Sequence, residues 1–205
     1  MNVRAAKRVR RTPEEARRLI LDAAEARLAR TGPDGLRLQD IAADAGISHP
    51  SILHHFGSRE GLVRALTRRA VDELKDKLFA ALSVEHPSTE AQLDQVFDAF
   101  RNGLAQRLAW LATVDARGEH PEERQVLRQI ADTVHARRQS AAPPGTVISR
   151  EDTDAMMHLV AAAAFGDAMY GAHLRRSAGI APGPETDHRF RAWLAALLQA
   201  HQKRR

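Results

Sequence analysis

The stretch from residue 38 to residue 56 constrains the fold of this chain more than any other part. Its first half has one apolar helix face with the spacing i, i+3, i+4 and i+7, made by Leu38, Ile41, Ala42 and Ala45. Asp40 and Asp44 point from this helix toward water. Gly46 follows at the position where a helix ends in the left-handed conformation, which a residue without a Cβ adopts at little cost. We therefore predict a short amphipathic helix and then a sharp turn.

A second short helix is predicted directly after this turn. Ser48 is a suitable N-cap, and Pro50 falls in the first helical turn, where the missing N–H costs nothing. Ile52 and Phe56 are one turn apart and can be buried together, which leaves the other side of the helix polar. Two short helices joined by such a turn are typical of a helix-turn-helix, in which the second helix enters the major groove of DNA. An ordinary helical hairpin is the alternative.

The net charge of +5 is concentrated in the same part of the chain. Residues 1–81 hold 16 Lys and Arg against 11 Asp and Glu, whereas the remaining residues hold 15 of each. Five of the cations lie near the N-terminus with no acidic residue among them: Arg4, Lys7, Arg8, Arg10 and Arg11. Such an arm has too few apolar groups to fold alone, and it gains free energy by lying along phosphates or in a minor groove. The alternative is a solvated tail without a specific contact.

The composition indicates a folded protein rather than a disordered or membrane-spanning one. Of the 205 residues 43% are hydrophobic, which is enough to bury a core, and the absence of cysteine agrees with a reducing compartment. The N-terminus lacks the apolar core of a signal peptide. The most apolar stretch, residues 155–172, is interrupted by His158 and Asp167. We therefore expect a cytoplasmic, nucleoid-associated protein with no membrane partner.

Helix signals recur along the whole chain, and no strand-like alternation accompanies them. Thr12 begins a capping box. Further helices are expected to open at Ser58, Thr89, Pro121, Ser149 and Pro184. Gly103 is expected to bend or divide the helix that starts at Thr89. The predicted fold is all-α with about nine helices: a three-helix domain with the basic arm over residues 1–57, a long connecting helix over 58–86, and a helical domain over 87–205.

The order of these parts resembles that of the TetR family of bacterial transcriptional regulators. The residues that carry the resemblance are Ile41-Ala42, Ala45-Gly46-Ile47-Ser48 and His55-Phe56-Gly57-Ser58-Arg59-Glu60-Gly61-Leu62. They fall between Thr12 and Ala70, and the rest of the chain agrees with the family only in length and helical character. The resemblance implies a homodimer that binds a palindromic double-stranded DNA operator as a repressor, until a small molecule enters the C-terminal domain. Activation of transcription is the alternative.

Three positions depart from the pattern of the family. Leu53 stands where a tyrosine that contacts the DNA backbone is usual, and it can instead pack inward. Arg37 replaces a threonine that commonly caps the second helix, so a phosphate contact is retained but the cap is lost. Arg59 replaces the usual lysine and keeps a positive charge beside the start of the fourth helix. We expect phosphate binding to be preserved with its details rearranged.

DNA contacts are expected from the basic arm and from side chains around the helix-turn-helix. Besides the five arm cations, these are Arg37, Gln39, Ser48, His49, Pro50, Ser51, Leu53, His54, His55 and Arg59. His49, Ser51 and His54 are the residues expected to select the base sequence.

The family also implies roles for the C-terminal helices, the last two of which form its dimer interface. The interface residues would be Ala161, Ala164, Phe165, Ala168, Phe190, Trp193, Leu194 and Leu197. The candidate pocket residues are Phe97, Phe100, Leu104, Leu108, Trp110, Leu111, Asp115, Met157, His158 and Tyr170. The alternative for each is a place in the protomer's own core, where a buried His158 would need a polar partner.

The aromatic and aliphatic candidate pocket favours an apolar or amphipathic organic effector over a metal, and no cofactor is implied. The sequence has no Gly-rich phosphate loop, no G-x-S-x-G elbow and no histidine pair at metal spacing, so we expect no enzymatic activity. A helical enzyme, and a protein that coats DNA without sequence preference, are the other classes to be weighed. The coating protein predicts similar affinity for all sequences and a steep dependence on salt.

Overall fold

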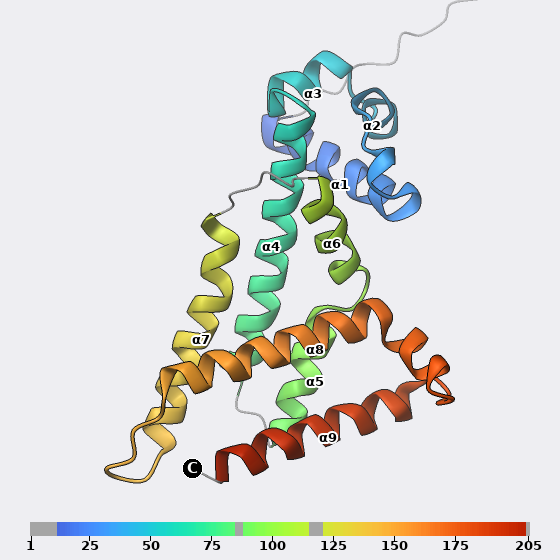
Figure 1. The fold of residues 1–205 in the computed structure, drawn as a ribbon. Helices are drawn as coiled ribbons and strands as arrows, with labels where there is room; N and C mark the ends of the chain where they lie inside the picture. Colours follow the sequence, from blue (N-terminus) through green and yellow to red (C-terminus); the bar gives the residue numbers. More distant parts are fainter. Residues whose placement is uncertain (1–11, 85–87, 115–120, 204–205) are drawn as a thin grey trace, which may run out of the picture. The chain divides into compact units, whose positions relative to one another are not determined.

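The computed structural model describes residues 12–84, 88–114 and 121–203, with no side-chain description for residues 121–124 and 203. Within these ranges the chain forms nine α-helices, one short 3-10 turn and no strand (Figure 1). The predicted all-α class is therefore confirmed. Over the same ranges, no helix is both long enough and apolar enough to cross a bilayer.

Contacts divide the chain into two compact units, which we call the head and the C-terminal unit. The head comprises Met1–Thr67 with Trp110–Ala116, and the C-terminal unit comprises Arg68–Ala109 with Arg117–Arg205. The division falls inside two helices, α4 (Arg59–Ser83) and α6 (Leu104–Val114). It is based on contacts and does not test the predicted functional borders at residues 57 and 86.

The head is built from the first helices of the chain. In order these are α1 (Pro13–Thr31), the 3-10 turn η1 (Pro33–Gly35), α2 (Leu38–Ala45), α3 (His49–Phe56) and the first turns of α4. Each of α1, α2 and α3 contributes a completely buried isoleucine: Ile20, Ile41 and Ile52. These side chains belong to the apolar faces that the helical spacing defines, so the three helices share one small core.

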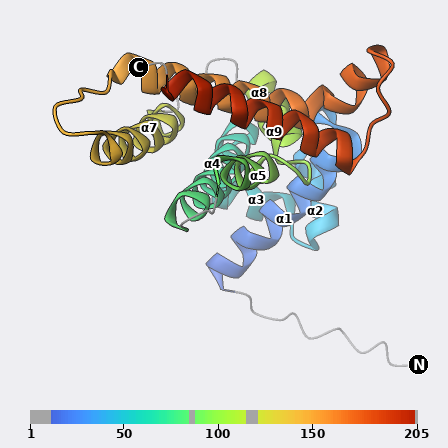
Figure 2. The same cartoon turned by 90° about the horizontal axis from the view of Figure 1, so that it is seen from below.

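The C-terminal unit contains the remaining helices, seen from two sides in Figures 1 and 2. They are α5 (Thr89–Ala99), the first part of α6 (Leu104–Val114), α7 (Pro121–Ala141), α8 (Arg150–Ser177) and α9 (Pro184–Lys203), and they follow the second part of α4. Helix α5 packs against both α8 and α9, and α7 packs against α8. The core centres on Phe97, whose ring meets Phe190 edge-on with the ring centres 6.0 Å apart.

Local capping signals explain where several of these helices begin. Thr12 accepts a hydrogen bond from the backbone N–H of Glu15 at 3.2 Å, and Glu15 accepts one from Thr12 N–H at 2.8 Å, so the predicted capping box is confirmed. Ser149 caps α8 as predicted, by accepting from Asp152 N–H at 3.3 Å. Ser58 accepts from Gly61 N–H at 3.1 Å at the start of α4.

Two details of the second half of the chain concern α5 and the break after it. The prediction that Thr89 caps α5 is wrong, because Ser88 holds that position and accepts a hydrogen bond from Ala91 N–H at 3.1 Å. The predicted division near Gly103 is confirmed. Asn102 and Gly103 have φ values of 58° and 80°, which interrupt the helical path between α5 and α6.

Candidate nucleic-acid interface

The turn between α2 and α3 has the predicted left-handed geometry. Gly46 has φ 61° and ψ 38°, and Ile47 N–H donates to the carbonyl oxygen of Ala42 at 3.0 Å. This bond closes the end of α2 and starts the chain toward α3. Ser48 holds the N-cap position of α3, but its hydroxyl makes no capping hydrogen bond. The predicted position of this cap is therefore right, whereas the predicted side-chain bond is absent.

Helix α3 buries one side chain and exposes the opposite face. Ile52 is fully buried, whereas Pro50, Leu53 and His54 are exposed and lie at i, i+3 and i+4 on one face. The suggestion that Leu53 packs inward is wrong, since 39% of the residue is exposed. We call Pro50, Leu53 and His54 the exposed triplet of α3. It is the part of this short helix that a DNA groove could receive.

The other predicted contact residues of the helix-turn-helix lie around this triplet. His49, Ser51 and His55 are half-buried, whereas Ser48 is exposed. Arg37 and Gln39 are also exposed, at the start of α2, where Arg37 occupies the N-cap position without a side-chain capping bond, as its residue type predicts. The five cations of the basic arm, Arg4, Lys7, Arg8, Arg10 and Arg11, lie outside the described residues.

Arg27 on α1 fixes the orientation of α2, and sequence reasoning missed it. Its guanidinium donates to the Asp44 carboxylate at 2.8 Å and to the Asp40 carboxylate at 3.1 Å. A third, longer bond reaches the Asp40 backbone oxygen at 3.4 Å. Asp44 is exposed, as predicted, and Asp40 is half-buried, but the sequence did not predict that both pair with Arg27. Their spacing of i and i+4 on one face could have indicated a shared basic partner.

The charges of this cluster stabilise one another. The hydrogen bond from Arg27 holds the pKa of Asp44 below its ordinary value, against a smaller desolvation effect, and Arg30 adds to the lowering at 3.5 Å. The hydrogen bond to Asp44 also raises the pKa of Arg27. Both groups stay ionised at neutral pH, so the cluster neutralises two acids close to the candidate DNA face. We call Arg27, Asp40 and Asp44 the α1–α2 clamp.

Two further arginines connect elements of the head. Arg59 Nε donates to the backbone oxygen of Leu36 at 3.0 Å, which ties the start of α4 to the segment before α2. Arg17 lies over the ring of Phe56, with its guanidinium carbon 4.7 Å from the ring centre. Arg59 thus has a positioning role in the head in addition to the predicted phosphate contact.

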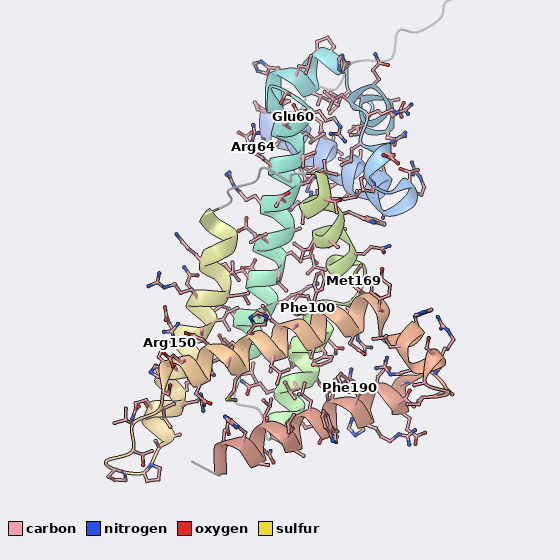
Figure 3. The ribbon with its side chains drawn as sticks, viewed as in Figure 1. Glu60, Arg64, Phe100, Arg150, Met169 and Phe190 are labelled. Atoms are coloured by element: carbon pink, nitrogen blue, oxygen red, sulfur yellow. The ribbon has the colours of Figure 1, made fainter. Side chains whose placement is uncertain are left out.

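The start of α4 also carries a negative charge near Arg59. Glu60 and Arg64 lie on the first turns of this helix (Figure 3). Hydrogen bonds from its own backbone N–H and from the Ser58 hydroxyl hold the pKa of Glu60 below its ordinary value, with smaller contributions from Arg59 and Arg64. An acid at a helix N-terminus is stabilising, and here it partly balances the nearby cations.

A cavity of about 270 Å³ lies among α4, α5, α7, α8 and α9 in the C-terminal unit. Of the ten predicted pocket residues, Phe100 and Met157 line it, as does Ala161 from the predicted interface set. Met157 and Ala161 are one turn apart on α8, and Phe100 follows the end of α5. The cavity is therefore a small, mostly apolar chamber, which has the character of a ligand site.

The other predicted pocket residues do not line this cavity. Phe97, Leu104 and Leu108 belong to or pack on the core, and Trp110 and Leu111 belong to the head. His158 is exposed on a surface groove of α7 and α8, so it needs no buried partner, and Tyr170 is 62% exposed. Asp115 lies outside the described residues. Helical spacing alone could not separate core from cavity, because both need the same apolar face.

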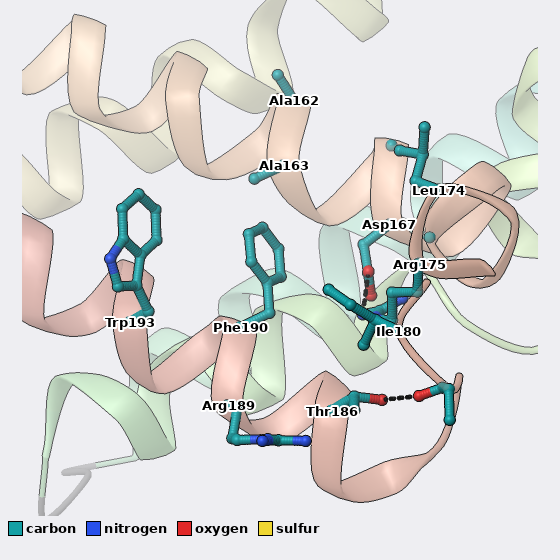
Figure 4. A pocket seen from close by; sticks show the side chains of 13 residues that line it. Ala162, Ala163, Asp167, Leu174, Arg175, Ile180, Thr186, Arg189, Phe190 and Trp193 are labelled. Carbon is teal, nitrogen blue, oxygen red and sulfur yellow. Dashed lines mark hydrogen bonds and ion pairs between the residues drawn. The ribbon is translucent and has the colours of Figure 1, made fainter. Parts of the chain in front are cut away.

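A second, open hollow of about 880 Å³ lies between α8 and α9 (Figure 4). Phe190 and Trp193 border it from α9, while Ala162, Ala163 and Gly166 form its floor on α8. We call it the α8–α9 groove. Its rim is held by Arg175, which pairs with Asp167 at 2.6 Å and with Asp187 at 2.9 Å.

The structure divides the predicted interface residues into exposed and buried ones. Trp193 and Leu197 are 61% and 43% exposed, and Ala168 is exposed as well. Phe165, Phe190 and Ala161 are half-buried. Ala164 and Leu194 are buried in the chain's own core, which is the alternative given for each of these residues.

Within the residues that the structure describes, no group of three or more His, Cys, Asp or Glu side chains could hold a metal ion. Several charged groups of the unit pair with one another. Arg101 contacts Asp187 at 3.2 Å, and Arg138 contacts Asp152 at 2.7 Å.

Sequence comparison with known proteins matches mainly the head of this chain. The family described as "Bacterial regulatory proteins, tetR family" matches residues 20–66, which run from the buried part of α1 into α4. The regulator AlkX of Mycobacterium tuberculosis, an HTH-type transcriptional regulator, is 33% identical over 85 residues. This alignment covers 42% of the chain and 37% of that relative, so the chain matches less than half of the relative's length.

Solved structures share the fold over a longer range. A transcriptional regulator from Rhodococcus sp. RHA1 matches with a TM-score of 0.63 and 18% identity, over 93% of this chain and 97% of the other. The TetR Q116A variant from Acinetobacter baumannii, in complex with minocycline, matches with a TM-score of 0.56 and 17% identity, over 91% and 96% of the two chains. Residues 20–66 thus carry the sequence of the TetR family of bacterial regulatory proteins, and the described helices share the fold of solved TetR-like regulators.

Proposed function

We propose that this protein is a transcriptional regulator that binds a palindromic DNA operator as a homodimer. The observation that carries the proposal is the exposed triplet of α3, presented by a turn and an α1–α2 clamp that hold α2 and α3 in fixed orientation. In a helix-turn-helix the second helix enters the major groove while the first braces it against the backbone. His54 can donate or accept a hydrogen bond at a base edge, and Leu53 can contact a thymine methyl group.

The family relationship supports this function, and the charge distribution agrees with it. The five cations of the basic arm precede α1, and Arg37 is exposed at the start of α2. Cations at these places would contact phosphates and position the head without reading sequence. Base selection would then depend on the exposed triplet, together with the half-buried His49 and Ser51 beside it.

The test measures binding of the full chain to duplexes recovered by genome-wide mapping of bound DNA. We expect affinity for the mapped site to exceed that for a shuffled duplex by about a thousandfold or more. His54→Ala should reduce this ratio, whereas His158→Ala, which changes an exposed histidine on α8, should leave it unchanged. Equal affinity for both duplexes would contradict a sequence-specific regulator and support a protein that coats DNA.

The salt dependence tests the basic arm separately. Removal of residues 1–11 should weaken binding to all duplexes and reduce the slope of log affinity against log salt, because fewer counterions are released. A slope that does not change would show that the arm makes no phosphate contact.

Dimerisation is proposed to use the α8–α9 groove and the apolar side chains next to it. Trp193 and Leu174 are each 61% exposed, and Ile180 is 47% exposed. A cluster of large apolar side chains that are exposed in the single chain usually marks an interface. A second copy of the chain would cover them around a two-fold axis. Two heads held in this way would match the two halves of a palindrome.

Sedimentation of the full chain tests this interface. Trp193→Arg should weaken self-association by about 30-fold or more, since a buried tryptophan is a frequent interface anchor. Val147→Arg is the matched control, because Val147 is 88% exposed in the segment between α7 and α8. An unchanged dimer in the Trp193→Arg protein would place the interface elsewhere.

Repression is proposed to end when a small organic molecule occupies the cavity of the C-terminal unit. Support comes from the mostly apolar lining of this cavity and from the related fold of a TetR variant solved with minocycline. Reporter transcription in cells with and without the regulator distinguishes repression from activation. Higher transcription without the protein is the expected result, and lower transcription would identify an activator.

A further inference from the structure

The lining of the 270 Å³ cavity changes from polar to apolar along three of its helices. On α5 the lining begins with Thr89 and Gln92 and continues with Leu93 and Val96. These positions share one helix face, and with Phe100 just beyond the helix they span about 16 Å at 1.5 Å per residue. The cavity is thus polar at the start of α5 and apolar toward its end.

Helices α7 and α9 repeat this change from their own ends. On α7 the lining residues run from the apolar Ile130 and Val134 to Arg137 and Arg138 near the C-terminal end. On α9 they run from Leu198 to Gln202, again at the C-terminal end. The polar residues therefore come from the start of α5 and the ends of α7 and α9, which lie at the same edge of the C-terminal unit (Figure 1).

A network of ion pairs and hydrogen bonds joins the ends of α7 and α9 through the start of α8. It balances the charge of one of the two arginines, Arg138. Arg138 donates to the Asp152 carboxylate at 2.7 Å and to the Thr153 hydroxyl at 2.6 Å. The other carboxylate oxygen of Asp152 lies 2.6 Å from Nε2 of His201 on α9. Since the Asp152 side chain is only 6% exposed, it balances the charge of Arg138 inside the protein.

Arg137 is different, because within the described part of the chain its guanidinium has no ion pair. The described lining of the cavity also contains no Asp or Glu, so the one unbalanced charge at its polar end is positive. The side-chain amides of Gln92 and Gln202 add hydrogen-bond donors nearby. This set of groups favours an acceptor with negative charge, and a guanidinium binds a carboxylate through two parallel hydrogen bonds.

We infer that the cavity takes a small amphipathic organic anion, with its carboxylate-type head at Arg137 and its apolar tail toward Phe100. The inference rests on the proposed function, since it names the chemical class of the proposed effector. It also fixes the direction in which the ligand lies. Arg137 is exposed at the polar end of the cavity, so a neutral apolar molecule would gain no attraction from it and a cation would be repelled by it.

The experiment compares three probes with one tail and different heads: octanoate, octan-1-ol and octylammonium. Binding to the full chain is measured by calorimetry at neutral pH and without DNA. We expect octanoate to bind about tenfold more tightly than octan-1-ol, with octylammonium weakest, because a hydrogen bond between charged groups exceeds one to a neutral hydroxyl. Equal affinities, or preference for octylammonium, would overturn the inference.

Two variants locate the head of the probe. Arg137→Gln should lower octanoate affinity about tenfold and leave octan-1-ol affinity unchanged, and Arg137→Lys should restore part of the loss. Arg128→Gln is the control, because Arg128 is an exposed arginine on the same helix that lines the surface groove instead. Octanoate binding that does not respond to Arg137→Gln would overturn the placement.

Methionine methyl NMR locates the tail. Met156 and Met157 line the cavity, whereas Met169 on α8 does not. Octanoate should shift the methyl signals of Met156 and Met157 and leave that of Met169 in place, and the opposite pattern would overturn the placement. Release of the mapped operator by octanoate is measured separately. Binding at Met157 without release would support the site and contradict the proposed effector mechanism, so the two failures are distinguishable.

Discussion

The head and the C-terminal unit are both helical, but different kinds of contact define them. In the head, a glycine turn, a capping box and a clamp between residues 17 or fewer positions apart fix α1, α2 and α3. In the C-terminal unit, Asp152 pairs with His201 49 positions away, and Arg101 pairs with Asp187 86 positions away. The candidate DNA face therefore follows from short-range patterns, whereas the cavity and the groove follow from long-range packing.

The largest effect is expected from a substitution that destabilises the core of the C-terminal unit. It tests whether the two units unfold separately. Phe97 is 1% exposed and packs against Phe190, so Phe97→Ala should cost about 3–5 kcal/mol of unfolding free energy in urea. The chain has two tryptophans, Trp110 in the head and Trp193 in the C-terminal unit, so each reports on one unit when the other is replaced by phenylalanine. The Trp193 transition should shift more.

The control is the smaller truncation Phe97→Leu, which should cost less than Phe97→Ala because it leaves a smaller cavity. If Trp110 and Trp193 report equal shifts of the urea transition for Phe97→Ala, the two units unfold together and do not differ in stability.

A smaller effect is expected at the turn of the head. Gly46 has φ 61°, and a Cβ built on it would meet no atom within 4 Å. Gly46→Ala should therefore cost about 1 kcal/mol for backbone conformation alone, and Gly46→Asn should cost less, because asparagine tolerates the left-handed region better. Urea unfolding followed by Trp110 fluorescence measures both. A larger cost for asparagine than for alanine would contradict this reading of the turn.

The α1–α2 clamp should make the stability of the head depend on acid. The folded-state pKa of Asp44 is lowered, chiefly by its hydrogen bond from Arg27, so the stabilisation is present above the ordinary aspartate pKa of about 4 and is lost as pH falls through the folded value. Asp44→Asn should remove part of this acid dependence. Asp34→Asn, at the η1 turn, is the control. Identical profiles of the wild-type and Asp44→Asn proteins between about pH 2 and 5 would contradict the clamp.

The smallest effect concerns two caps that look alike in sequence. Thr12 makes a capping bond to Glu15 N–H, whereas the Ser48 hydroxyl makes none. Thr12→Ala should therefore lower the free energy of unfolding by about 1 kcal/mol, and Ser48→Ala by only about 0.3 kcal/mol. Thermal unfolding of both variants measures the difference. A cost for Ser48→Ala that matches Thr12→Ala would show that Ser48 caps α3 in solution.

Much of the head could be predicted, because its signals are local. The apolar spacing of α2, the left-handed Gly46 and the capping box of α1 each involve residues within about two helical turns. What the sequence did not predict depends on a distant partner. The pairing of Asp40 and Asp44 with Arg27 was missed because Arg27 lies on another helix.

The C-terminal sites were harder to predict from the same patterns. An apolar residue at helical spacing can face the core, a cavity or a partner molecule, and the pattern does not distinguish these places. Phe97 and Phe100 illustrate this, since both are buried but only Phe100 lines the cavity. Leu194 and Trp193 are neighbours in sequence, yet one is core and the other is exposed.

The sequence by itself determined the all-α class, the helix-turn-helix and most helix starts of this protein, because caps, turns and apolar periodicity act between near neighbours. Only the tertiary structure decided which acids pair with Arg27, which residues surround the cavity and why Arg137 is left without an acidic partner there. Those outcomes depend on helices that meet from distant parts of the chain. Burial and charge compensation arise from contacts between those helices, so they cannot be predicted from any single segment.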